Sequence, residues 1–138
     1  MRPAFPLLAL CCALGATAAA AQSFEIAAEH AGFREYYCVT RGTLTNTGSE
    51  PIQELNGYFL LYEDGEEVGR SRGSSFLALD PGASAEARFE APNAPCDTAD
   101  EYHFIVNACM RDGSFFDRGD CADMVTGTEA VTTVVPRE

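Results

Sequence analysis

YYCVTRGTLTNTGSEPIQELNGYFLLY, residues 36–62, holds two runs of strand-forming residues with a turn between them. In the first run, 36–46, alternate side chains project to opposite faces and β-branched residues are frequent, as is typical of a strand. Residues 47–51 contain Gly, Ser and Pro, the composition of a turn. The second run, 53–62, is rich in aromatic and aliphatic residues. We therefore expect two strands of one β-domain in this stretch.

Three features of the stretch indicate where its side chains pack. Gly42 occupies an inward position of the first strand, where a missing side chain lets a neighbour pack close. Asn46 ends that strand and can bond amides of the following turn. The second strand has two apolar faces, with Phe59 and Leu61 on one and Tyr58, Leu60 and Tyr62 on the other. Such a strand is central in its sheet or has its outer face covered.

Turn residues and short apolar runs continue outward from this stretch. Asp64-Gly65 and Asp80-Pro81-Gly82 predict turns, because Asp and Gly tolerate a positive φ and Pro presets φ. The expected strands cover residues 23–28, 36–46, 53–62, 67–76, 83–90, 101–110 and 130–135. About seven strands at this spacing predict an all-β domain, an antiparallel immunoglobulin- or fibronectin-like sandwich. A small closed barrel is the alternative.

Two motifs suggest a family. Residues 42–48, GTLTNTG, resemble the G-x-V-x-N-x-G/S opening of FxLyD-type domains. Residues 59–63, FLLYE, are similar to the Phe-x-Leu-Tyr-Asp motif of that family, with Glu63 in place of the Asp. Val68-Gly69, the turn 79–82 and the strand 83–89 follow in the family's order. The resemblance covers 36–106 and implies an immunoglobulin-like sandwich in a bacterial envelope or secreted protein, with no catalytic residues to transfer.

The N-terminal residues 1–21 have the features of a secretory signal peptide. Arg2 precedes an apolar run, 7–14, and an alanine-rich stretch, 18–21. The apolar run is shorter than the roughly 20 residues needed to span a bilayer, so we expect no membrane span. Residues 8–11 place Leu where lipoprotein processing requires a small residue, so we expect no lipid anchor. Export would leave one domain, 22–138, in the periplasm or outside the cell.

Four cysteines remain in that domain: Cys38, Cys96, Cys109 and Cys121. An even number of cysteines in an exported chain favours two disulfides in an oxidising compartment. We favour the pairs Cys38–Cys96 and Cys109–Cys121, although four cysteines allow other connectivities. The sequence has no C-x-x-C motif and only two His residues, so we expect neither a metal centre nor a cofactor.

Charge and motif content exclude several functions. Without Arg2 the chain has eight basic and 21 acidic residues, which should repel nucleic acid. His30 and His103 have no nucleophile in a recognisable motif, so we expect no enzyme. The sequence therefore predicts a module that binds another protein. Exposed edge strands in such a sandwich also permit a homodimer.

Candidate binding residues gather in the segment 112–123. Phe115 and Phe116 are aromatic side chains of the kind enriched at interaction hot spots, or else they form a second small core under the disulfide. Arg118-Gly119-Asp120 is the integrin-binding tripeptide, or else an ordinary turn. Four carboxylates could supply oxygen ligands to Ca²⁺, namely Asp112, Asp117, Asp120 and Asp123. A calcium- or small-ligand-binding envelope protein is therefore the alternative function.

Overall fold

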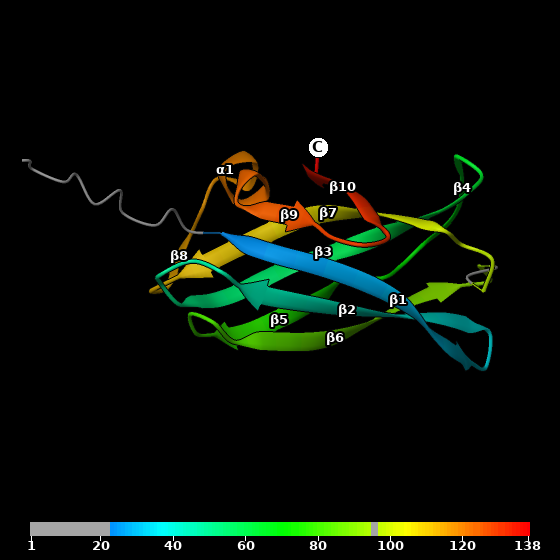
Figure 1. The fold of residues 1–138 in the computed structure, drawn as a ribbon, viewed down its shortest axis with the longest axis horizontal. Coiled ribbons are helices and arrows are strands. Elements are labelled where there is room, and N and C mark those ends of the chain that lie inside the picture. Colours follow the sequence, from blue (N-terminus) through cyan, green and yellow to red (C-terminus); the bar gives the residue numbers. More distant parts are fainter. Residues whose placement is uncertain (1–22, 95–96) are drawn as a thin grey trace, which may run out of the picture.

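This computed structural model describes residues 23–94 and 97–138 of the chain (Figure 1). These residues contain ten strands and one short helix, joined by turns and loops. The strands are β1 (Phe24–Arg34), β2 (Tyr37–Asn46), β3 (Ile52–Glu63), β4 (Glu66–Arg70), β5 (Ser74–Leu79), β6 (Ser84–Pro92), β7 (Glu101–Arg111), β8 (Ser114–Phe115), β9 (Val125–Gly127) and β10 (Val131–Pro136). The helix is α1 (Arg118–Asp123). The predicted signal peptide, 1–21, lies outside the described residues.

The strands form two sheets that pack face to face. One sheet has the order β6-β2-β1-β9, and the other has the order β10-β7-β3-β4, with β5 also paired to β3 and β8 to β7. The β3–β4 hairpin lies at the end of the sandwich opposite α1 and β8 (Figure 1). The expected all-β class and sandwich are confirmed, and β3 is a central strand of its sheet, as its two apolar faces indicated.

Aromatic rings fill the space between the sheets. The ring of Phe59 lies 4.7 Å from that of Phe89 and 5.0 Å from that of Phe104. Gly42 faces these rings, and a Cβ atom there would come within 2.8 Å of the Phe89 ring. The expectation that Gly42 allows close packing is therefore confirmed, because any side chain would have to displace an aromatic ring of the core.

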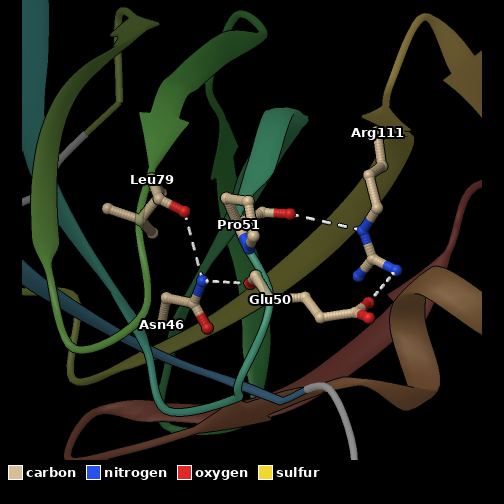
Figure 2. A network of polar contacts seen from close by, with 5 residues as sticks. All are labelled: Asn46, Glu50, Pro51, Leu79 and Arg111. Atoms are coloured by element: carbon tan, nitrogen blue, oxygen red, sulfur yellow. Dashed lines mark hydrogen bonds and ion pairs between the residues drawn. The ribbon is translucent and has the colours of Figure 1, made fainter.

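Asn46 holds the turn that joins the two sheets (Figure 2). Its side chain is fully buried, and its Nδ2 donates to the Glu50 carbonyl at 2.8 Å and to the Leu79 carbonyl at 3.1 Å. Its Oδ1 accepts from the Gly48 amide at 3.0 Å. The predicted bond to a turn amide is confirmed, and the side chain also ties β2 to the end of β5.

Arg111 ties the same turn to the end of β7 (Figure 2). Its guanidinium lies 2.5 Å from the Glu50 carboxylate and donates to the Pro51 carbonyl at 3.3 Å. The guanidinium carbon also lies 5.0 Å from the centre of the Phe116 ring. Glu50 thus contacts Asn46 through its backbone and Arg111 through its side chain, which links the turn to both neighbouring strands.

The prediction of a purely antiparallel sandwich is wrong. Strand β9 pairs in parallel with β1, and β10 pairs in parallel with β7. Parallel pairing requires a crossover connection rather than a tight hairpin. After β8 the chain passes through α1 to β9 in the four-stranded sheet and then to β10 in the other sheet. The number of strands also rises from the expected seven to ten in the described residues.

The expected strand 67–76 is in fact two strands, β4 and β5, which pair with the same side of β3. Between them, Ser71 binds Phe59 twice: its amide donates to the Phe59 carbonyl and its hydroxyl accepts from the Phe59 amide, both at 2.9 Å. The next residue, Arg72, donates its amide to the Glu90 carbonyl of β6. The chain therefore leaves β3 here and contacts the other sheet.

A disulfide joins Cys109 of β7 to Cys121 of α1, whose Cα atoms lie 6.0 Å apart. Both cysteines are fully buried. The bond fastens the crossover segment to the six-stranded sheet. The other favoured pair includes Cys96, which lies outside the described residues.

Candidate functional site

A shallow groove lies on the outer face of the six-stranded sheet, with a volume of about 570 Å³. Tyr58 and Leu60 of β3, Ile105 of β7 and Val135 of β10 contribute its apolar lining. Arg70, from β4, and Arg137, which follows β10, are its cationic residues. We call these six residues the sheet groove.

Strand register brings the apolar residues of the groove together. Tyr58 lies opposite Ile105, and Ile105 lies opposite Val135, so three side chains form one row across three strands. Leu60 lies opposite Arg70 on the adjacent strand pair. Ile105 points away from the core yet is only 7% exposed. The row therefore has a buried centre, Ile105, between the partly exposed side chains of Tyr58 and Val135.

The two arginines of the groove are held in different ways. The guanidinium carbon of Arg70 lies 5.5 Å from the centre of the Tyr58 ring, within the range of a cation–π contact. A guanidinium nitrogen of Arg70 lies 3.8 Å from the Glu67 carboxylate, a long ion pair. The backbone amide of Arg137 donates to the Val106 carbonyl at 2.9 Å, whereas its side chain makes no ion pair within the described residues.

A smaller depression of about 250 Å³ adjoins the groove and shares Tyr58, Arg70 and Arg137 with it. Asn107 lines this depression, and its Nδ2 donates to Asn56 at 2.9 Å. The Oδ1 of Asn107 is buried and accepts no hydrogen bond from the described residues. The depression therefore adds an amide group to the two guanidinium groups of the groove.

A cluster of polar and aromatic side chains lies on the same strands, nearer the β3–β4 hairpin. The ring of His103 stacks on that of Tyr62 with the centres 4.1 Å apart. The Glu101 carboxylate lies 2.7 Å from His103 Nε2 and accepts from the Thr132 hydroxyl at 2.5 Å. Glu101 therefore links β7 to the segment that begins β10.

Acidification should weaken this link. The hydrogen bond from Thr132 and then that from His103 lower the pKa of Glu101 below its ordinary value of 4.5. A carboxyl whose pKa is lowered by folding stabilises the protein above its unfolded pKa, and that contribution is lost as the pH falls through the folded value. We expect the urea midpoint of the wild type to fall more steeply below pH 4.5 than that of Glu101→Gln.

The matched control is Glu86→Gln, an exposed carboxylate on β6 that makes no ion pair within the described residues. The urea midpoint of Glu86→Gln should change with pH in the same way as that of the wild type. Parallel midpoint curves for the wild type and Glu101→Gln would mean that Glu101 contributes nothing to acid stability.

The structure brings the two candidate aromatic residues to one depression of about 440 Å³, which Asp117, Asp120 and Met124 also line, but it gives them different exposure. Phe116 is half-buried against the core and below Arg111, as the second-core interpretation requires. Phe115 lies in β8 and is 70% exposed. Arg118, Gly119 and Asp120 form the first turn of α1, so the tripeptide is helical. These residues lie at the opposite end of the sandwich from the β3–β4 hairpin (Figure 1).

The four candidate calcium ligands lie in different local environments. Asp112 has a positive φ of 51° in the turn between β7 and β8. The Asp117 carboxylate caps α1 by accepting from the amides of Gly119 and Asp120. Asp120 and Asp123 lie within α1. Within residues 23–94 and 97–138, no three side chains of His, Cys, Asp or Glu gather as a metal site would require.

Sequence reasoning found only part of the sheet groove. The second apolar face of β3, with Tyr58 and Leu60, indicated a strand that is central or has its outer face covered. Arg70, Val135 and Arg137 were missed, because their position depends on the split of β4 from β5 and on the parallel pairing of β10. The outward apolar residue in the β7 run, Ile105, was the signal that could have extended the surface across the sheet.

The sequence matches no family model, and comparisons with curated proteins and with solved structures found no match either. In the part of the chain that the structure describes, no helix has the length and apolar character of a membrane span. The geometry of the sheet groove is therefore the basis for a proposed function.

Proposed function

We propose that this chain is an exported, non-enzymatic, immunoglobulin-like module that binds a partner protein through the sheet groove. The observation that carries the proposal is the apolar row of Tyr58, Ile105 and Val135 on an outer sheet face. Clustered apolar side chains on the surface of a soluble protein mark interaction sites, whereas single ones are ordinary. The resemblance to FxLyD-type domains supports an envelope or secreted location.

The polar groups at the groove favour binding over catalysis. Arg70 and Arg137 remain protonated at physiological pH and cannot act as general bases. His103, the nearest imidazole along β7, already bonds Glu101 and stacks on Tyr62. General acid–base catalysis needs a group that can exchange a proton with a bound substrate. The groove instead offers an apolar surface flanked by hydrogen-bond donors, which suits recognition of a partner.

Phe115 is a weaker candidate for the binding surface. It is the most exposed phenylalanine of the described residues and lines a depression with Phe116 and Met124, but it belongs to a strand of only two residues. The apolar residues of the groove, in contrast, come from three strands and touch one another through the sheet register. Partner binding should therefore depend on the groove more than on Phe115.

Capture of partners from bacterial envelope extract tests the proposal. The protein, purified from an oxidising compartment and immobilised, is compared with Val135→Glu in the groove and with Leu77→Glu on β5. Val135 is 39% exposed and Leu77 is 63% exposed, so each change puts a charge on an accessible aliphatic position of the same sheet. We expect wild type and Leu77→Glu to retain the same proteins and Val135→Glu to lose them.

Two results would contradict this function. Equal recovery of those proteins by Val135→Glu would place the binding surface elsewhere. Recovery of no specific protein by the wild type would remove the support for an interaction module. Circular dichroism and thermal unfolding of all three proteins establish that any loss reflects the surface and not misfolding.

A further inference from the structure

The sheet groove brings two arginines of this acidic chain, Arg70 and Arg137, into one lining. Outside the groove, Arg34, Arg41 and Arg111 are paired with carboxylates at 3.6, 2.8 and 2.5 Å, whereas Arg72, Arg88 and Arg118 make no ion pair within the described residues. Arg70 has only a long ion pair, and the Arg137 side chain has none within the described residues. Two guanidinium groups without a short ion pair to the protein's own acids therefore line one groove.

From this we infer that the groove takes an acidic peptide segment of its partner, with carboxylates at Arg70 and Arg137 and an apolar side chain over Leu60 and Ile105. The inference rests on the proposed function and specifies the partner's chemistry. A guanidinium forms strong, charge-assisted hydrogen bonds with a carboxylate. The apolar row supplies a contact for an aliphatic or aromatic side chain of the same segment.

The charges around the groove select against other anionic partners. The whole chain carries a formal charge of −12, which repels nucleic acid and anionic membranes. Glu138 also lines the groove, so its side-chain carboxylate offsets one of the two guanidiniums. A segment with one or two carboxylates and an apolar side chain suits this lining better than a continuous polyanion does.

Both guanidiniums are positioned for one ligand. Arg70 and Arg137 line the sheet groove and also the adjoining depression, with Tyr58 common to both. The cation–π contact with Tyr58 holds Arg70 toward this shared region, and the backbone bond to Val106 fixes the position of Arg137 beside β7. One bound segment can therefore reach both cations and the apolar row.

Fluorescence anisotropy with a labelled peptide library tests the inference on the intact protein. The probes are short peptides that place Leu or Phe between Asp and Glu residues. Matched peptides replace the acids by Asn and Gln, or the apolar residue by Ser. We expect binding of the acidic, apolar probes, weakening of about tenfold or more on Arg70→Gln with Arg137→Gln, and weaker binding at high salt.

The matched control is Arg88→Gln, because Arg88 is an exposed arginine on β6 of the other sheet. It should leave the affinity unchanged. Several results would overturn the inference: no probe binds, the amide peptides bind equally well, or the double variant binds as tightly as the wild type. Arginine-dependent binding of single-stranded DNA or of anionic vesicles in place of the peptides would also overturn it.

The two proposals fail in different ways. In one case, Val135→Glu loses the captured proteins whereas the double variant Arg70→Gln with Arg137→Gln retains them. This result would support the interaction module and contradict the binding of an acidic segment. In the other case, Val135→Glu still captures the same proteins. This result would contradict both the groove as the binding surface and the binding of an acidic segment in it.

Discussion

Replacement of Phe59 by alanine is expected to lower the free energy of unfolding by about 3–5 kcal/mol, the usual cost of removing a buried phenylalanine ring. Phe59 is completely buried, and its ring contacts those of Phe89, Phe104 and Tyr102, with the centres 4.7, 5.0 and 5.9 Å away. Its loss leaves a cavity between the two sheets, because three large rings cannot all move into the space. Urea unfolding followed by circular dichroism measures the change.

The matched control is Phe115→Ala, since Phe115 is 70% exposed and has little buried surface to lose. A small domain is stable by about 5–15 kcal/mol, so Phe59→Ala removes a large share of that stability. Phe59→Leu keeps most of the side-chain volume and should give a smaller loss that is measurable in a folded protein. A loss for Phe59→Ala no larger than that for Phe115→Ala would mean that the ring cluster does not hold the sheets together.

The strands around Phe59 are the part of the fold that the sequence predicts well. Alternation over 36–46 assigned Gly42 to the inner face, and alternation over 53–62 put Phe59 and Leu61 on one face. The structure places Gly42 and Phe59 in the ring cluster. These predictions succeed because they need only local information. The direction of each side chain follows from the period of a strand, and the turn between the strands has turn-forming residues.

The pairing of the late strands could not be read from the sequence. Strand β9 has only three residues, and the short helix α1 lies in a segment with several Asp and Gly residues. The strand with which a parallel strand pairs depends on the path of the crossover connection. The residues of a short strand do not determine that pairing. The sheet groove depends on this pairing, because Val135 reaches Ile105 only when β10 lies beside β7.

The split between β4 and β5 has a similar cause. Residues 71–75, SRGSS, have the Ser- and Gly-rich composition of a loop, but strand-forming residues on both sides made the whole run 67–76 look like one strand. In the structure the Ser71 hydroxyl accepts from the Phe59 amide at 2.9 Å, so a side chain replaces the next backbone partner. Only the position of β6, which binds Arg72 through the Glu90 carbonyl, explains why the chain leaves the sheet there.

Replacement of Asn46 by alanine is the second change with a large expected effect, a loss of about 3 kcal/mol in the free energy of unfolding. The side chain is fully buried and makes three hydrogen bonds, to Glu50, Leu79 and Gly48. Each buried polar group left without a partner costs about 1–3 kcal/mol, and the costs are not fully additive. Alanine removes the donor to the Glu50 and Leu79 carbonyls beneath the turn 47–51, while the Gly48 amide keeps only its bond to the Ser23 carbonyl at 3.1 Å.

The control for Asn46→Ala is Asn56→Ala, because Asn56 also bonds through its amide but is only half-buried on the outer sheet face. Water can replace its lost bonds, so the loss should be smaller. Asn46→Asp supplies a second test. The introduced carboxylate would face the carbonyls of Glu50 and Leu79, so this variant should gain stability as the pH falls and the carboxyl becomes a donor.

An equal loss for Asn46→Ala and Asn56→Ala would contradict this interpretation, because burial would then add nothing to the cost. The turn 47–51 would in that case be held mainly by the ion pair between Glu50 and Arg111, and Glu50→Gln would be the more damaging change. That ion pair is exposed on the Glu50 side, with 58% of the side chain accessible, and exposed pairs contribute about 1 kcal/mol or less. The buried amide of Asn46 should therefore dominate, and urea unfolding of the three variants separates the two explanations.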